Sequence, residues 1–599
     1  MQFPFKKIRP GQKQFYEDAL RSIDQKKVLL SYAPTGIGKT AAVLGAAVKK
    51  QLEDRDGLVF FLTSRHSQHS IAVETLKKIQ EANDVEINVV DIVNKKDMCP
   101  LGADMGRMEF ESYCYSMKRQ GTCKYGRVNP LAVATLEREV FHVEEAVDIS
   151  KKFGSCPYFT ALSRLKTADV VICDYSYIFD PQIRSVIVGK AMKSLEDFIV
   201  IVDEAHNLPL RVREYGTYSL TTGLLGASKK LAKEILRDKL LANQINVLMK
   251  TLKTDKESEI TKSEVLTWID EAFYDQFIGD VTYSTFLSCT ETAAERLREL
   301  TNDPLPNVLD SVSSFFKIWN ENLQDYVRIM DSDGIHMVPL NVALISSEVF
   351  DKARSTILMS ATLYPQEMYA NILGIENPII KSYDSPFPES NRLVVSTEGL
   401  SSAYKNRGPE MFRLYAKKID ELSKEVPGNV AVFFPSYDLM NSILEHLNTK
   451  RKIIVETSDW KKEKKSSILK IAKEKENILF CFVQGASFFE GVDFKNNSLK
   501  SIIIAGLPIS PPSVINQRLL DFYDYKFGKG YEYVYLLPAF NKVLQSAGRG
   551  IRSPTDICSI LLLDSRFNYL NYKKFIPNWK IKKSAIPLSL IKDFYRGRK

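Results

Sequence analysis

The sequence predicts an α/β protein that contains two doubly wound parallel sheets in tandem. Short apolar runs rich in Val, Ile, Leu and Phe alternate with longer helical patterns, which is typical of parallel strand–helix units. These runs form two separate series along 599 residues, a length that exceeds what one hydrophobic core supports. We therefore expect two sheets, each covered by helices on both faces.

The two series of predicted strands are separated and interrupted by other segments. The first comprises residues 28–30, 58–62, 170–173, 198–202 and 356–359, and the second comprises 430–434, 453–455, 478–483, 502–505 and 560–563. A cysteine-bearing segment (95–165) and a helical segment (216–340) interrupt the first series. We predict a first sheet domain from residues 1–94, 166–215 and 341–370, and a second from residues 371–599.

Composition and charge exclude some classes of protein and favour others. Hydrophobic residues make up 44% and charged residues 26%, as in ordinary soluble domains. No run of about 18 apolar residues occurs, which argues against a membrane-spanning helix, and the start lacks the apolar stretch of a secretory signal. We expect a cytoplasmic protein. The net charge of +9 and the basic segment 573–599 fit either a polyanionic partner or a solvated tail.

A glycine-rich segment has the residues and the context of a phosphate-binding loop. It reads Gly36-Ile-Gly-Lys-Thr40, follows a predicted strand and precedes a helix of small residues. Gly36 and Gly38 allow backbone N–H groups to close around phosphates, Lys39 reaches the β and γ oxygens, and Thr40 binds magnesium at the helix N-terminus. The segment therefore predicts an ATP site with Mg²⁺.

Acidic and basic residues elsewhere complete the chemistry of ATP hydrolysis. Asp203 and Glu204 end a predicted strand, where Asp203 would hold magnesium and Glu204 would polarise the attacking water. Arg549 and Arg552 lie three positions apart on a predicted helix and hence on one face. Arginines from a second domain stabilise the charge on a transferred phosphoryl group.

Four of the eight cysteines fall between positions 99 and 156. They are Cys99, Cys114, Cys123 and Cys156, separated by 14, 8 and 32 residues without a C-x-x-C pair. Four thiolates can hold zinc or an iron–sulfur cluster. The spacing disfavours a zinc ribbon but does not choose the metal by itself.

Further short motifs occur in a defined order and spacing. They are Arg9-Pro-Gly-Gln12, Thr63-Ser-Arg-His-Ser-Gln68, Ser360-Ala-Thr-Leu363, the segment 485–494 and Gln545-Ser-Ala-Gly-Arg-Gly-Ile-Arg552. With the phosphate loop and Asp203-Glu-Ala-His206, this set resembles superfamily 2 helicases of the XPD/DinG type over most of the chain. The resemblance implies two RecA-like motor domains, with an iron–sulfur cluster domain (95–165) and a helical arch domain (216–340) inserted in the first.

The resemblance also implies roles for individual residues. Gln12 would contact adenine, and Gln545, Arg549 and Arg552 would sense the γ-phosphate. His206, Ser360 and Thr362 would couple hydrolysis to movement, and Cys99, Cys114, Cys123 and Cys156 would ligate a [4Fe–4S] cluster. Arg65, His66 and Lys95, the last of which lies four positions before the first cysteine, would contact the DNA backbone.

These features together predict an ATP-dependent DNA helicase. By resemblance it would move 5′→3′ on single strands, unwind forked DNA and act in an excision-type repair pathway, as a monomer of archaeal origin. Two alternatives stay open: an RNA helicase, and a non-enzymatic single-strand-binding scaffold with a vestigial ATP site. Comparing the stimulation of ATP hydrolysis by single-stranded DNA and by single-stranded RNA distinguishes a DNA helicase from an RNA helicase. Unaltered unwinding by Lys39→Ala would support the scaffold.

Overall fold

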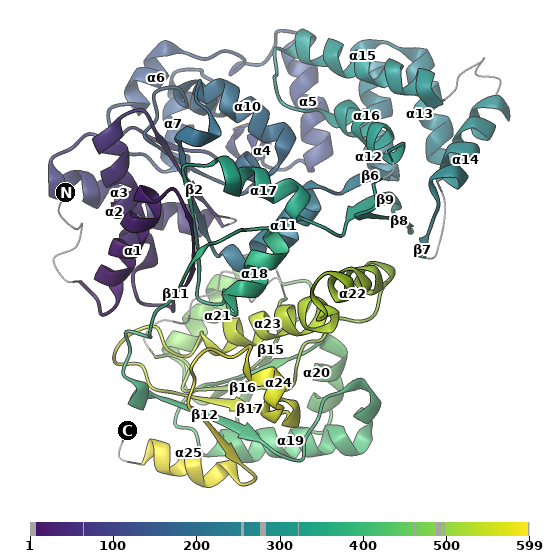
Figure 1. Ribbon diagram of the computed structural model, residues 1–599. Helices are drawn as coiled ribbons and strands as arrows, with labels where there is room; N and C mark the ends of the chain where they lie inside the picture. Colours follow the sequence, from purple (N-terminus) through teal and green to yellow (C-terminus); the bar gives the residue numbers. More distant parts are fainter. Residues whose placement is uncertain are drawn as a thin grey trace.

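The computed structural model describes residues 8–63, 65–252, 257–275, 283–321, 323–460, 462–486, 494, 497–596 and 598. The described residues form two seven-stranded sheets and one four-stranded sheet, with helices around each (Figure 1). The predicted α/β class with two parallel sheets is thereby confirmed.

The first sheet has the strand order β11-β1-β10-β5-β2-β4-β3, and all its pairs are parallel. Its strands are β1 (Val28–Tyr32), β2 (Leu58–Leu62), β3 (Val89–Asp91), β4 (Val170–Cys173), β5 (Phe198–Asp203), β10 (Ser355–Ser360) and β11 (Ile379–Ser382). The five predicted strands are confirmed to within two residues. Because β11 pairs with β1, the first sheet continues past the predicted limit at residue 370.

Helices cover both faces of this sheet. They are α1 (Gln12–Asp24), α2 (Lys39–Asp54), α3 (His66–Asn83), α9 (Ser176–Phe179), α10 (Pro181–Ala191), α11 (Leu208–Tyr215), α17 (Ala343–Lys352) and α18 (Gln366–Leu373). Successive strand residues point to opposite faces. Val59 and Phe61 thus join the apolar cluster of α1, α2 and α3, whereas Phe60 and Leu62 join the cluster on the other face.

Two insertions leave the first sheet. Between β3 and β4 lie α4 (Lys95–Met98), α5 (Arg107–Arg119), α6 (Pro130–Leu136), α7 (Val143–Lys152) and α8 (Pro157–Arg164). Between α11 and α17 lie β6 (Tyr218–Thr221), α12 (Thr222–Lys230), a π-helical segment (Leu231–Leu236), α13 (Lys239–Thr251), β7 (Ser258–Glu259), α14 (Lys262–Asp275), α15 (Tyr283–Thr301), α16 (Val308–Trp319), β8 (Tyr326–Met330) and β9 (Gly334–Pro339).

The second insertion is more than a helical segment. Its four strands form an antiparallel sheet in the order β6-β9-β8-β7. The buried residues Phe286, Phe315 and Trp319 belong to an apolar cluster separate from those of the two large sheets. This insertion, at the upper right of Figure 1, therefore has an apolar core apart from the large sheets, to which Tyr115 of α5 in the first insertion also contributes.

The second large sheet is also parallel throughout, in the order β14-β15-β13-β16-β17-β12-β18. Its strands are β12 (Arg392–Thr397), β13 (Val430–Phe434), β14 (Lys452–Val455), β15 (Ile478–Val483), β16 (Ser501–Ile504), β17 (Cys558–Leu562) and β18 (Ile581–Ser584). Its helices are α19 (Pro409–Lys424), α20 (Tyr437–Leu444), α21 (Lys462–Glu474), α22 (Val514–Phe527), a π-helical segment (Glu532–Leu536), α23 (Leu537–Ala547), α24 (Leu570–Lys573) and α25 (Pro587–Tyr595). The five predicted strands are confirmed, and β12 and β18 are additional.

The two large sheets are joined through one helix of the first and a helical stretch of the second. Asn541 Nδ2 donates to the Tyr369 hydroxyl at 2.5 Å, and Asn371 Nδ2 donates to the Tyr533 hydroxyl at 2.8 Å. An apolar cluster that includes α18 and α23 continues from one sheet to the other. This joint places the carboxyl edge of the first sheet opposite the second sheet domain (Figure 1).

Candidate nucleotide site and cysteine cluster

The phosphate loop connects β1 to α2 and has the backbone that its glycines permit. Gly36 (φ 87°) and Gly38 (φ 83°) are left-handed, a conformation that side chains other than glycine disfavour. A Cβ on Gly38 would also lie 2.2 Å from Gln12 Nε2. Gln12 holds the loop from α1: its Nε2 donates to Gly38 O at 3.1 Å, while Arg9 N donates to its Oε1 at 3.0 Å.

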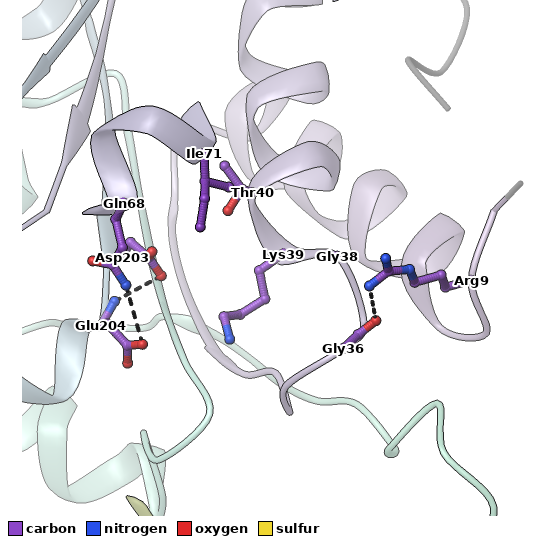
Figure 2. A pocket seen from close by; sticks show the side chains of 9 residues that line it. All are labelled: Arg9, Gly36, Gly38, Lys39, Thr40, Gln68, Ile71, Asp203 and Glu204. Atoms are coloured by element: carbon purple, nitrogen blue, oxygen red, sulfur yellow. Dashed lines mark hydrogen bonds between the residues drawn. The ribbon is translucent and has the colours of Figure 1, made fainter. Parts of the chain in front are cut away.

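A cavity of about 210 Å³ opens beside this loop (Figure 2). Its lining comes from the segment before α1, the phosphate loop, the first turn of α2, α3 and the end of β5: Arg9, Gly36, Gly38, Lys39, Thr40, Gln68, Ile71, Asp203 and Glu204. The structure thus brings together residues that the sequence separates widely. Lys39 extends toward the two carboxylates in Figure 2, as a phosphate-binding lysine opposite a magnesium-binding acid requires.

The acid pair is fixed by its backbone. Asp203 ends β5, and Glu204 adopts a left-handed φ of 50°. The buried Tyr175 hydroxyl donates to Asp203 O at 2.5 Å and to Glu204 O at 3.2 Å. Non-glycine residues in this conformation are costly and cluster at functional sites.

Burial and neighbouring charges set the ionisation of the pair. The pKa of the Asp203 carboxyl is raised, because burial disfavours its charge and Glu204 lies beside it. Burial also acts against the charge of Glu204, but His206, Lys39 and Arg65 outweigh burial and lower its pKa. Interacting carboxyls such as these titrate as a pair, and Glu204 is the member held as the carboxylate.

A chain of hydrogen bonds runs from the second sheet domain to Glu204. Gln545 Nε2 donates to His206 Nε2 at 2.6 Å. The His206 proton therefore resides on Nδ1, which donates to Ser360 Oγ at 2.7 Å, and the Ser360 hydroxyl donates to Glu204 Oε2 at 3.1 Å. Burial lowers the pKa of His206 to about 4, so the ring is neutral at pH 7. Thr362 Oγ1 lies 3.2 Å from Ser360 Oγ.

Arg549 and Arg552 lie beyond the end of α23, the helix that carries Gln545. The prediction that Arg549 and Arg552 share a helix face is wrong, because α23 ends at Ala547 and Gly548 follows. A Cβ on Gly550 would lie 2.4 Å from Cys558 Sγ, so this segment packs its bare backbone against β17 instead of continuing the helix. The Arg552 N–H donates to Asp556 Oδ2 at 2.7 Å.

The segment that begins α3 reaches the nucleotide cavity. Gln68 accepts a hydrogen bond from Thr63 Oγ1 and donates to Glu204 Oε1 at 3.5 Å. The charge of Arg65 lowers the pKa of Glu204, so Arg65 lies near the same carboxylates. His66 begins α3, and its side chain is outside the described residues. Most of the predicted motif at 485–494 also lies outside them, at positions 487–493.

The four candidate metal ligands lie in four separate segments of the first insertion. Cys99 follows α4, Cys114 is on α5, Cys123 follows α5 and Cys156 precedes α8. All four are partly buried. Burial raises the pKa of Cys99 to about 11, and the charges of the three other thiols add to this shift. The thiols therefore share one neighbourhood, although in the described part of the chain no three His, Cys, Asp or Glu side chains are arranged as a metal site.

Lys95, the predicted DNA contact, has a partner within the protein. It forms an ion pair with Asp303 from the loop between α15 and α16, and its side chain is only 16% exposed. Lys118 lies 3.6 Å from the same carboxylate. In this structure Lys95 thus joins the first insertion to the second instead of facing solvent.

Phe387 lies at the phosphate loop, although no sequence motif indicates it. It lies between β11 and β12, and a Cβ on Gly36 would meet its ring at 2.0 Å. The connection between the two sheets therefore lies directly on the phosphate loop. A single phenylalanine in a Pro- and Ser-containing linker carries no pattern that indicates such a contact.

Comparison with known proteins matches both halves of this arrangement. Residues 61–225 match the DEAD_2 family model, and residues 419–583 match the model described as Helicase C-terminal domain. The ATP-dependent DNA helicase XPD of Sulfolobus acidocaldarius is 23% identical over 95% of this chain and 98% of its own length. Together these matches support an XPD-type superfamily 2 helicase. An ATP-dependent helicase of this type uses ATP and Mg²⁺.

Other similarities agree with this assignment. The transcription and DNA repair factor IIH helicase subunit XPD of Schizosaccharomyces pombe is 23% identical over 96% of the chain and 89% of its own length. A solved XPD helicase structure superimposes with a TM-score of 0.67 at 22% identity and covers 97% of this chain and all of the other. Within the described residues, none of the helices combines the length and apolar character needed to cross a membrane.

Proposed function

We propose that the protein is a DNA helicase that hydrolyses ATP to move along a single strand and separate a duplex. The observation that carries the proposal is the hydrogen-bond chain from Gln545 through His206 and Ser360 to Glu204. It links Glu204, the residue that we propose polarises the attacking water, with the second sheet domain. Movement of one domain against the other thereby alters the environment of the hydrolytic carboxylate.

The deciding experiment measures ATP hydrolysis with and without single-stranded DNA. We expect a strong stimulation by DNA and a loss of it in Lys39→Ala, because that ammonium group is needed at the β and γ oxygens. Equal or greater stimulation by single-stranded RNA would instead favour an RNA helicase. Unwinding that survives in Lys39→Ala would favour a binding scaffold with a vestigial ATP site.

We further propose that Cys99, Cys114, Cys123 and Cys156 hold a [4Fe–4S] cluster with a structural role. Two buried ammonium groups, those of Lys95 and Lys118, face one shared carboxylate next to these thiols. Both ammonium groups favour the thiolate form of Cys156 against the effect of burial, and the thiolate is the form in which cysteine ligates a metal. Four thiolates also tie together loops that have few apolar residues between them. Iron analysis and visible absorption of anaerobically purified protein test this assignment, and zinc in place of iron would overturn it.

We assign the pathway from the relatives, and the polarity and the DNA contacts from the resemblance of the sequence motifs to the family. The relatives are named as DNA helicases and as a DNA repair factor subunit, which supports DNA as the substrate and a role in repair. Forked DNA as the preferred substrate and 5′→3′ movement follow from the resemblance alone. Arg65, His66 and Lys95 are the proposed contacts to the DNA backbone.

Unwinding assays on substrates with 5′ or 3′ single-stranded tails test the direction of movement. Mass determination by light scattering tests the expected monomer. An intracellular location and an archaeal source remain predictions.

A further inference from the structure

We propose that Gln68 is a positioning residue for ATP hydrolysis, whose side-chain amide fixes the plane of the Glu204 carboxylate. The site residues expected from the sequence do not include Gln68, and the hydrogen-bond chain from Gln545 to Glu204 does not pass through it. The inference rests on the proposed function, because it takes Glu204 as the group that polarises the attacking water.

The carboxylate of Glu204 is held at both of its oxygens. Gln68 Nε2 donates to Oε1 at 3.5 Å (Figure 2), and Ser360 Oγ donates to Oε2 at 3.1 Å. The two donors belong to different elements, α3 and the end of β10. The last torsion of a glutamate side chain is broad, so a single donor leaves the carboxylate free to turn. Two donors, one at each oxygen, fix its plane and the direction of its remaining lone pairs.

The other partner of Gln68 determines which end of the amide faces Glu204. The Thr63 hydroxyl donates to Gln68 Oε1. Neighbouring charges lower the pKa of Glu204 and hold it as the carboxylate, and a carboxylate only accepts hydrogen bonds. The NH₂ end of the amide must therefore face Glu204. Thr63 is buried, and its backbone N–H donates to Cys173 O at 2.9 Å, so the sheet itself fixes the orientation of the amide.

The next residue of α3 anchors this turn of the helix from the other side. His69 is buried, and its Nδ1 donates to Asp91 Oδ1 at 2.5 Å at the end of β3. The second oxygen of Asp91 accepts from Val143 N at 2.8 Å. A shift of α3 would break these buried bonds, which is costly. Gln68 thus lies between two fixed points, and a donor fixed in advance needs no reorganisation during the reaction.

The test measures kcat and KM for ATP hydrolysis stimulated by single-stranded DNA. Gln68→Ala should lower kcat about tenfold, as for one lost hydrogen bond to a charged group. KM should stay within about twofold, because the residues of the phosphate loop are unaltered. Gln68→Glu keeps the length but places a second carboxylate against Glu204, so kcat should fall at least as far. Gln182→Ala is the matched control, because that amide donates to Ser314 Oγ at 3.0 Å and does not line the cavity.

A double variant tests whether Gln68 acts through Glu204. Glu204→Asp shortens the carboxylate and takes it out of reach of the amide. Adding Gln68→Ala to Glu204→Asp should then change kcat by less than about twofold. A further loss of about tenfold would overturn the inference, because Gln68 would then act without Glu204.

A pair of variants at Thr63 tests the orientation of the amide without altering Gln68. Thr63→Val removes the hydroxyl and should lower kcat roughly threefold, whereas Thr63→Ser keeps the hydroxyl and should restore the rate. Equal rates in the two variants contradict the inference. This pair also decides the question if Gln68→Ala does not fold.

Failure of the inference differs from failure of the proposed function. An unchanged kcat in Gln68→Ala, with hydrolysis abolished in Glu204→Gln, overturns only the role of Gln68. A raised KM with an unchanged kcat in Gln68→Ala also overturns it, because Gln68 would then serve nucleotide binding. Full hydrolysis in Glu204→Gln would instead remove the proposed role of Glu204 itself.

Discussion

At the scale of single residues, Ser360 is the branch point of the nucleotide site. Its hydroxyl donates to Glu204 and accepts from His206, whose other ring nitrogen accepts from Gln545. Each of these groups is largely buried, so a lost bond is not readily replaced by water. The orientation of Glu204 therefore depends on a residue of the other sheet domain.

Ser360→Ala should interrupt this chain while leaving the fold intact. We expect the DNA-stimulated kcat for ATP hydrolysis to fall about tenfold, which corresponds to about 1.4 kcal/mol in the activation barrier, as expected for one lost hydrogen bond to a charged group. Ser346→Ala is a suitable control, because that buried hydroxyl bonds to Val342 O and Leu373 O away from the cavity. An unchanged kcat in Ser360→Ala would show that the chain is not used.

The pH dependence of hydrolysis should not contain a histidine step near pH 6.5. Burial lowers the pKa of His206 to about 4, so as pH falls the ring gains a second proton, and stops accepting from Gln545, only near pH 4. We expect the ratio of the ATPase rates of the unaltered protein and His206→Gln to stay constant between pH 5.5 and 8. A ratio that declines as the pH drops through 6.5 would contradict this.

The sequence predicts which residues form the nucleotide site only where they belong to one contiguous motif. The phosphate loop and the acid pair are each contiguous in sequence and each follow an apolar strand, so their place at one sheet edge could be inferred. The contact between Gln545 and His206 spans 339 positions and exists because of how the two sheet domains pack. The partner of Lys95 was unpredictable for the same reason, since Asp303 belongs to another insertion.

At the scale of elements, the second insertion is a small domain in its own right. The sequence indicated its helices because their apolar residues recur every three or four positions. Its strands were missed because β6 and β7 are short and the sheet is small. The ten predicted strands of the large sheets were easier, because strands buried on both faces read as continuous apolar runs.

Trp319→Ala should therefore destabilise the second insertion, whose apolar cluster also includes Tyr115 of α5, without destabilising the two large sheets. The side chain is fully buried and stacks on Phe315 with a centroid distance of 5.1 Å, and its loss should cost about 3–5 kcal/mol. Because this core is separate from those of the large sheets, limited proteolysis should cleave within 216–340 at a lower temperature. ATP hydrolysis without DNA should stay within about twofold. If resistance to proteolysis within 216–340 and ATP hydrolysis without DNA were lost at the same temperature, the second insertion and the large sheets would unfold as one unit.

At the scale of the whole molecule, the cysteine cluster and the nucleotide cavity are separate sites on one chain. Cys156→Ser should abolish the visible absorption of the purified protein and reduce its iron content. We expect duplex unwinding to fall at least tenfold while ATP hydrolysis without DNA stays within about threefold, because no residue lining the described cavity belongs to the first insertion. Cys289→Ser, outside that insertion, is the control. Full iron content in Cys156→Ser would contradict the assignment of this ligand.

The apolar contact between α18 and α23 limits how the two sheet domains can move. Tyr369 and Phe540 are buried in a cluster that continues across the boundary, so pulling the halves straight apart would wet it. A rotation about the contact between α18 and α23 would keep the cluster out of contact with water and would change the separation of the two domains away from this contact. Each cycle of ATP hydrolysis would then rotate one domain about a fixed point. The length of the step along the strand would depend on the distance between that point and the bound strand.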